Sequence, residues 1–173
     1  IDSAQTMYAK VENVQGIQFL DKYRAEIYLK QDKPDLAIPI YDALLQIDKK
    51  DSVAYILAEG YTFLSKAYTN KNKFKLAEKY LDSARVQASI SENLSHQISI
   101  ASQQAKIYKQ KKQLGLGILE LQTILKNEEI SSFQQSKKDL YKELSELYTL
   151  NKDPKNAFLS LQQHHTIKAV SYT

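Results

Sequence analysis

The sequence predicts an all-α protein, an α-solenoid of antiparallel helix pairs, and three observations support this prediction. Gly and Pro together account for only 7 of 173 residues, too few for the frequent turns of a β-sandwich or barrel. Between polar breaks, apolar residues follow the three- and four-residue spacing that marks one side of a helix. Tyrosines recur every 40 residues, at Tyr28, Tyr68, Tyr108 and Tyr148, which indicates an internal repeat.

Residues at other positions of the repeat recur with the same 40-residue spacing, and each such set of equivalent residues is called a column. A small residue stands three positions before each tyrosine (Ala25, Ser65, Ala105, Ser145) and another nine positions after it (Ala37, Ala77, Gly117, Ala157). An apolar residue directly precedes each tyrosine (Ile27, Ala67, Ile107, Leu147), and a large residue comes thirteen positions after it (Tyr41, Leu81, Leu121, Leu161). Small residues let two helix backbones approach closely, and the large ones fill the space beside that contact. One such hairpin cannot bury its faces alone, so stacking on the next pair supplies the core.

Each repeat is therefore expected to hold two helices, named helix A and helix B in chain order. The chain begins with a helix B of an earlier, partial repeat at 2–14, because Ala4, Tyr8 and Val11 have helical spacing. The pairs of helices A and B that follow are expected at 16–31 and 34–48, 51–71 and 73–89, 92–111 and 114–127, and 130–151 and 154–168.

The breaks between helices A and B carry helix-starting residues. Pro34 and Pro154 suit a first helical position, and Asp153 and Asn72 are placed to cap the helix that follows. Pro39 falls inside a helix B, where it removes a hydrogen bond and is expected to bend the first turns.

The whole chain, 1–173, is expected to be a single array, divided into 1–14, 15–50, 51–90, 91–129 and 130–169. The start inside a repeat and the lack of an initiator Met suggest a piece of a longer protein. No apolar run is long enough to predict a transmembrane span. The compartment, cytoplasmic or extracytoplasmic, and the oligomeric state stay open.

This pattern resembles the tetratricopeptide repeat family, in its longer form of about 40 residues. The matching residues are the small residue and the tyrosine of helix A, with the alanine-type residue and the large residue of helix B. The early tryptophan of the family is replaced by Asp21, Tyr61, Ala101 and Tyr141, and its last alanine by Leu44, Ala84, Ile124 and His164. The resemblance implies a right-handed superhelix with a concave groove lined by helix A.

The same resemblance nominates groove positions that would contact a partner: Phe19, Lys22, Glu26 and Leu29; Glu59, Thr62, Lys66 and Thr69; Ser99, Ser102, Lys106 and Lys109; and Asp139, Lys142, Glu146 and Thr149. Chaperone-binding members of the family hold a terminal carboxylate with a clamp of lysine and asparagine. Here Lys22 fits the first clamp position, but Glu26, Phe63, Ser99 and Gln103 occupy the others, so a chaperone adaptor is not expected.

The sequence carries no recognisable catalytic or metal-binding motif. Cys is absent, and the three histidines form no metal-binding spacing. His164 and His165 are neighbours whose side chains point about 100° apart on a helix, so they are expected to be a solvent-exposed pair near the chain end. Gly115 and Gly117 are not expected to form a phosphate-binding loop, because Gly117 belongs to a column of small packing residues. The carboxylate pairs Glu128–Glu129 and Glu143/Glu146 are expected on solvated helix faces. No enzymatic activity, metal or cofactor is therefore expected.

The net charge of +4 comes almost entirely from lysine, since only two of the 24 basic residues are arginine. Nucleic-acid binding is not expected without clustered arginine and aromatic residues. Lysines flank every break between helices A and B: Lys30, Lys33, Lys71, Lys73, Lys109, Lys111, Lys112, Lys152 and Lys155. One interpretation is a basic ridge that attracts an acidic partner or an anionic membrane surface. The other is that they are ordinary solvated cations at helix C-termini, where the helix dipole favours positive charge.

The leading hypothesis is a non-catalytic scaffold that binds a protein or peptide in its groove. The alternative is a signal-sensing domain of a bacterial sensor histidine kinase or transcriptional regulator, which the long repeat and the Lys/Asn/Ile/Tyr-rich composition favour. An architectural oligomerisation module is a third, weaker hypothesis.

Overall fold

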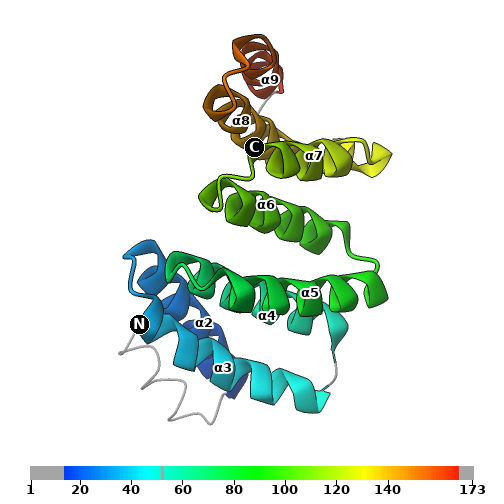
Figure 1. Ribbon diagram of the computed structural model, residues 1–173. Coiled ribbons are helices and arrows are strands. Elements are labelled where there is room, and N and C mark those ends of the chain that lie inside the picture. The colour runs from blue at the N-terminus through cyan, green and yellow to red at the C-terminus, as the bar shows by residue number, and fades with distance from the viewer. Residues whose placement is uncertain (1–13, 52, 168–173) are drawn as a thin grey trace. The chain divides into compact units, whose positions relative to one another are not determined.

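The computed structural model describes residues 14–51 and 53–167, and in these residues the chain is all-α without strands (Figure 1). The helix expected at 2–14 lies outside the described residues, apart from its last position. The elements are α2 (Val14–Lys30), α3 (Pro34–Asp51), α4 (Ala54–Asn70), α5 (Phe74–Ile90), α6 (Leu94–Gln110), α7 (Leu114–Leu125), the 3₁₀ helix η1 (Glu128–Ser132), α8 (Gln134–Leu150) and α9 (Pro154–Thr166).

Helices that follow one another in the chain pack in adjacent pairs. α2 packs on α3 and α3 on α4, while α6, α7, α8 and α9 contact one another in sequence. α4 contacts α5 through aromatic rings, because Tyr68 stacks on Tyr80 with ring centroids 5.3 Å apart. The even-numbered helices are the expected helices A and the odd-numbered ones the helices B.

Three helices A begin later than expected, and α3 ends at Asp51 rather than at 48. α4 and α6 begin three and two residues later than expected, because Val53 and Asn93 have extended backbone and the Asn93 side chain accepts a hydrogen bond from the His96 N–H. The helix A expected from residue 130 begins instead as η1. Asn127 caps this short helix, and α8 starts only after Phe133.

The four turns from helix A to helix B share one backbone geometry. In each, an N–H donates to the carbonyl of the repeat tyrosine five residues earlier, with N···O distances of 2.8 or 2.9 Å: Lys33 to Tyr28, Lys73 to Tyr68, Gln113 to Tyr108 and Asp153 to Tyr148. The preceding N–H donates to a carbonyl three residues earlier. This pair of bonds is the Schellman motif, which satisfies the last carbonyls of a helix.

The motif requires left-handed backbone at one position, and none of the four turns has glycine there. Asp32, Asn72, Lys112 and Lys152 occupy it with φ between 55° and 60°. Asn72, expected to cap α5, is therefore the left-handed residue that ends the α4 turn, because asparagine tolerates this conformation. Asp153 does cap α9, and its carboxylate accepts the N–H of Asn156 at 3.1 Å.

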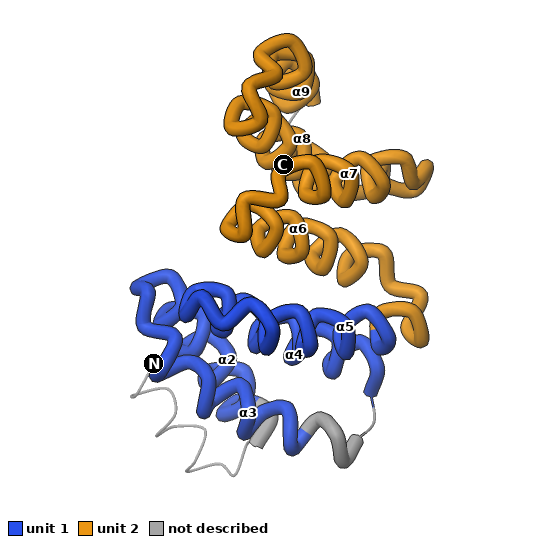
Figure 2. The backbone as a smooth tube through the Cα atoms, viewed as in Figure 1, with its two compact units in different colours: residues 1–87 blue, residues 88–173 orange. Residues whose placement is uncertain are grey.

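The chain divides into two compact units, residues 1–87 and 88–173, with the boundary inside α5 (Figure 2). Each unit has a buried cluster of its own. In unit 1 the cluster is Ala25, Ala37, Tyr41, Leu45, Leu57 and Leu64. In unit 2 it is Leu94, Ile98, Ala105, Ile118, Leu121, Ile130, Leu140, Leu144, Leu147, Tyr148 and Ala157.

The repeat columns supply much of these clusters. Both columns of small residues are buried in every described repeat. Two large residues depart from the pattern, since Ile27 and Leu161 are each 40% exposed. Ile27 lies on the first described helix and Leu161 on the last, so no further described helix pair covers them. α3 continues through Pro39, and the bend expected there stays a prediction.

Candidate functional site

The helices A of unit 1, α2 and α4, are joined by a charged and aromatic surface. Lys22 Nζ lies 2.6 Å from Glu59 Oε1, and it also lies 5.6 Å from the centre of the Phe63 ring. Lys66 Nζ lies 4.9 Å from the same ring. Two ammonium groups therefore flank one aromatic ring, an arrangement that the ring quadrupole favours.

A buried tyrosine lies beneath this surface. Tyr41 of α3 stacks on Phe63 with ring centroids 4.9 Å apart and an interplanar angle of 3°. Only 2% of Tyr41 is exposed, and its hydroxyl has no hydrogen-bond partner among the described residues. Burial raises the pKa of the Tyr41 hydroxyl well above its ordinary value, and the carboxylates of Glu26 and Glu59 raise it further, so Tyr41 stays neutral.

The nominated Phe19 is 58% exposed and packs edge-on against Tyr23 of the same helix, with ring centroids 4.6 Å apart. We call Phe19, Lys22, Glu26, Glu59, Phe63 and Lys66 the helix-A face of unit 1. Thr62, also nominated, is not available to a partner in this conformation. It is buried, and its hydroxyl donates to the Ala58 carbonyl at 2.7 Å.

The helices A of unit 2, α6 and α8, are joined by polar contacts. Ser102 Oγ donates to the Glu143 carboxylate, with O···O distances of 2.8 and 2.9 Å. Lys109 Nζ lies 2.8 Å from Glu146 Oε2. Because both contacts advance in the same direction along the two helices, α6 and α8 run parallel. We call Ser99, Ser102, Lys106, Lys109, Asp139, Lys142, Glu143 and Glu146 the helix-A face of unit 2.

The Glu143 carboxyl on this face has a raised pKa. Burial raises the pKa of its carboxyl, and the Ser102 hydrogen bond lowers it in part. The neighbouring carboxylates Glu146 and Asp139 raise this pKa further, and Lys109 lowers it. Solvation, the expectation for Glu143, is therefore wrong: the side chain is half-buried between α6 and α8, whereas Glu146 is exposed.

The other nominated residues of unit 2 lie on the same two helices with different exposure. Lys106, Asp139 and Lys142 are exposed, and Ser99 is half-buried. Asp139 accepts hydrogen bonds from the Gln135 amide of its own helix. The structure thus brings the unit 2 nominations together on one face of two parallel helices, with Lys109 and Glu146 already engaged in an ion pair.

Sequence reasoning did not place Glu143 and Tyr41 in the groove, and it considered Phe63 only as a residue at a position of the absent clamp. The 40-residue period could have identified two of them. Glu143 stands exactly two periods after Phe63, and each contacts the residue 41 positions earlier on the preceding helix A, Ser102 and Lys22 respectively. The role of Tyr41 beneath Phe63 has no such signal, because its column is one of core packing.

Two expectations outside the groove also change. His164 is half-buried rather than solvent-exposed, since its Nδ1 lies 2.9 Å from the Lys138 carbonyl oxygen, whereas His165 is exposed. Lys71, one of the turn lysines, forms an ion pair with Asp35 of α3.

A cleft of about 480 Å³ lies in unit 2 among α7, α8 and α9. Gln122 donates to the Tyr148 hydroxyl at 2.7 Å in its lining, beside Tyr141, Leu144 and Leu159. Over the described part of the chain, no group of three or more His, Asp or Glu side chains is arranged to hold a metal ion. None of the described helices combines the length and apolarity needed to cross a membrane.

The arrangement on each helix-A face suits recognition of a polar segment through charges and hydrogen bonds. Each face combines ammonium groups and carboxylates on two neighbouring helices, and the face of unit 2 adds the hydroxyl of Ser102. Comparison with protein-family models found no match for this chain, and comparison with curated proteins found none either.

Proposed function

We propose that the chain is a tetratricopeptide-like repeat, coiled as a right-handed superhelix, that binds a protein or peptide segment and catalyses no reaction. The observation that carries the proposal is the pairing of neighbouring helices A within each unit. Lys22 with Glu59 joins the two helices A of unit 1, and Ser102 with Glu143 joins the two helices A of unit 2. The 40-residue columns and the four equivalent turns support the repeat architecture.

A bound segment would lie across the parallel helices A, where side chains of both are accessible. Lys106 and Lys142 are exposed on α6 and α8, and they offer long cations to carboxylates or carbonyl groups of the segment. Lys109 and Glu146 are already paired, so a ligand must compete with their mutual attraction to use them.

The test starts with peptides selected from a random library on the 173-residue chain. Changing Lys106 and Lys142 together to alanine should weaken binding of a selected peptide about tenfold or more, and leave a complex that depends less on salt. The melting temperature should stay within a few degrees, because exposed lysines contribute little to stability.

The matched control removes two lysines from the turns, Lys112 and Lys152, and should leave peptide binding unchanged. If the control pair abolishes binding while the Lys106/Lys142 variant binds normally, the groove is not the binding site.

The narrower proposal is that the repeat senses a signal for an output domain of a bacterial sensor kinase or transcriptional regulator. The long repeat and the composition support it. Sequencing the parent gene beyond Thr173 tests it, because an encoded transmembrane span or DNA-binding helices would favour this role over a free-standing scaffold.

A further inference from the structure

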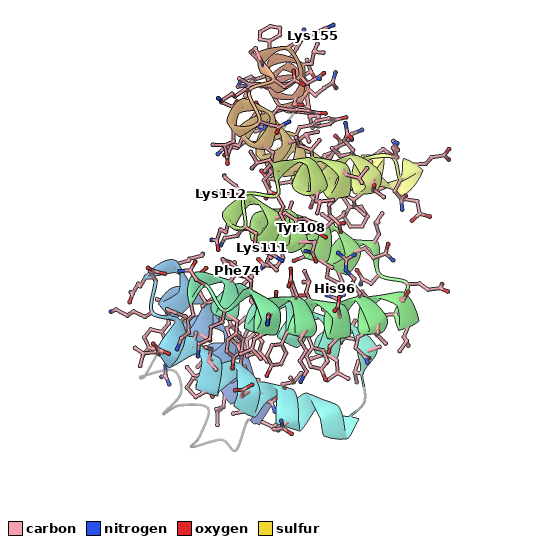
Figure 3. All side chains as sticks on the ribbon, viewed as in Figure 1. Phe74, His96, Tyr108, Lys111, Lys112 and Lys155 are labelled. Atoms are coloured by element: carbon pink, nitrogen blue, oxygen red, sulfur yellow. The ribbon has the colours of Figure 1, made fainter. Side chains whose placement is uncertain are left out.

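The end of unit 2 formed by its two A-to-B turns is strongly basic. We call Lys111, Lys112, Leu116, Leu150, Lys152 and Lys155 the turn edge of unit 2. The two turns lie at the same end of the unit because α6 and α8 run parallel, as the Ser102–Glu143 and Lys109–Glu146 contacts require. Lys112 lies at the turn between α6 and α7, and Lys155 lies at the start of α9 (Figure 3).

Negative charge at this edge is scarce. Residues 109–116 and 149–156 hold five lysines and one carboxylate, that of Asp153. The Asp153 carboxylate is committed to the start of α9, where it accepts hydrogen bonds from the backbone and side-chain nitrogens of Asn156. Lys109 is paired with Glu146, while Lys112, Lys152 and Lys155 are exposed. The edge therefore presents a net positive field to solvent.

Two of these lysines occupy unfavourable backbone positions. Lys112 and Lys152 have φ of 59° and 60°, in the left-handed region where glycine is far better tolerated than lysine. The corresponding residues of unit 1 are Asp32 and Asn72, types that tolerate this region. A helix dipole favours a cation anywhere in the last turn, so it does not by itself place lysine at the left-handed position.

Large apolar side chains are exposed among the lysines. Leu116 in the first turn of α7 is 47% exposed, and Leu150 at the end of α8 is 51% exposed. A surface that combines lysines with exposed leucines matches the boundary between anionic headgroups and acyl chains. Nucleic acid is a poorer fit, because residues 88–173 contain no arginine for phosphate or base recognition.

We propose that the turn edge of unit 2 binds the surface of a membrane that contains anionic lipids. The lysines contact headgroup phosphates, and Leu116 and Leu150 enter the boundary with the acyl chains. This contact is peripheral, and it uses a surface separate from the helix-A faces.

The test is cosedimentation of the 173-residue chain with lipid vesicles. The chain should bind phosphatidylcholine vesicles that contain about one-third phosphatidylglycerol, and binding should weaken as salt is raised. Pure phosphatidylcholine vesicles should bind at least about tenfold less. Changing Leu116 and Leu150 together to glutamine should weaken binding several-fold without removing its dependence on salt.

The decisive variant changes both Lys112 and Lys152 to glycine. It removes two charges and relieves both left-handed lysines, so vesicle binding should fall about tenfold or more while the melting temperature rises. A loss of binding therefore cannot be blamed on unfolding. The charge-conserving variant K112R/K152R should keep vesicle binding.

The matched control is K126Q/K137Q, which removes two lysines at the opposite end of α7 and α8 and should change vesicle binding by less than about twofold. Equal binding to both vesicle types, or unchanged binding by the glycine variant, would overturn the proposal. So would a chain that ignores vesicles but binds polyglutamate or RNA through the same lysines, because the edge would then serve another macromolecule.

Discussion

Two glycines of α7 stand two residues apart in very different surroundings. A Cβ atom at Gly115 would have no neighbouring atom within 4 Å. A Cβ atom at Gly117 would lie 3.3 Å from the carbonyl oxygen of Ala105 and 3.2 Å from Leu147 Cδ1. Leu147 has a flexible end that can shift, but the Ala105 carbonyl belongs to the backbone of α6. Close approach of α6 and α7 therefore disfavours a side chain at 117 but not at 115.

Changing Gly115 to alanine should raise the free energy of unfolding by about 0.5–1 kcal/mol, because alanine loses less backbone entropy in a helix. Changing Gly117 to alanine should instead lower it by about 1–2 kcal/mol, since the gain in helix propensity is outweighed by overpacking. Urea denaturation of the two variants measures both effects. Equal stabilisation by both would show that α6 and α7 are not in close contact.

The contrast between these glycines shows what the sequence allows a reader to predict. The 40-residue period assigns Gly117 to a packing column together with Ala37, Ala77 and Ala157, and the close backbone approach follows from that. Gly115 belongs to no column. Its surroundings become known only when the helix is placed in space.

At the scale of the helix, protonation of the Glu143 carboxyl is coupled to the packing of α8 on α6. A carboxyl whose pKa is raised by folding holds its proton more tightly in the folded state than in the unfolded one. The contribution of Glu143 to the free energy of unfolding is therefore highest below the ordinary value of 4.5, falls as the pH rises from there through the folded pKa, and is constant above it.

Changing Glu143 to glutamine should remove this fall, because glutamine carries no charge and its carbonyl still accepts the Ser102 hydroxyl. The variant should be more stable than the parent chain at about pH 7 and similar to it at about pH 4, as measured by urea denaturation at both values. A difference in stability between the variant and the parent chain that is the same at both pH values would contradict the expected shift at Glu143.

The sequence predicts where the helices A and B lie but not which side chains meet between them. Lys109 and Glu146 are 37 residues apart, and Ser102 and Glu143 are 41 apart. Both separations are close to one repeat, which is why neighbouring helices A could be anticipated as partners. The choice of atoms depends on side-chain rotamers and burial, and these have no counterpart in the periodicity. The periodicity also did not predict the short helix η1. Asn127 caps η1, and the helix A expected from residue 130 therefore begins only after Phe133.

At the scale of the whole molecule, each compact unit contains its own buried cluster, so neither cluster draws its members from the other unit. Residues 88–173 expressed alone should therefore be predominantly helical, with less than about a tenth strand, and should unfold cooperatively on heating. Far-ultraviolet circular dichroism measures both properties. A fragment that lacks helix, or melts without a cooperative transition, would show that the unit 2 core depends on residues 1–87.

The four A-to-B turns are closed by backbone atoms alone, with the tyrosine carbonyl as the shared acceptor. The side chain at the left-handed position therefore takes no part in these hydrogen bonds. Aspartate, asparagine and lysine all occupy this left-handed position in the four turns, and the backbone geometry of the turn is the same in each. A single point mutation at this position can therefore change the surface charge of one turn. The buried core of the repeat stays unchanged.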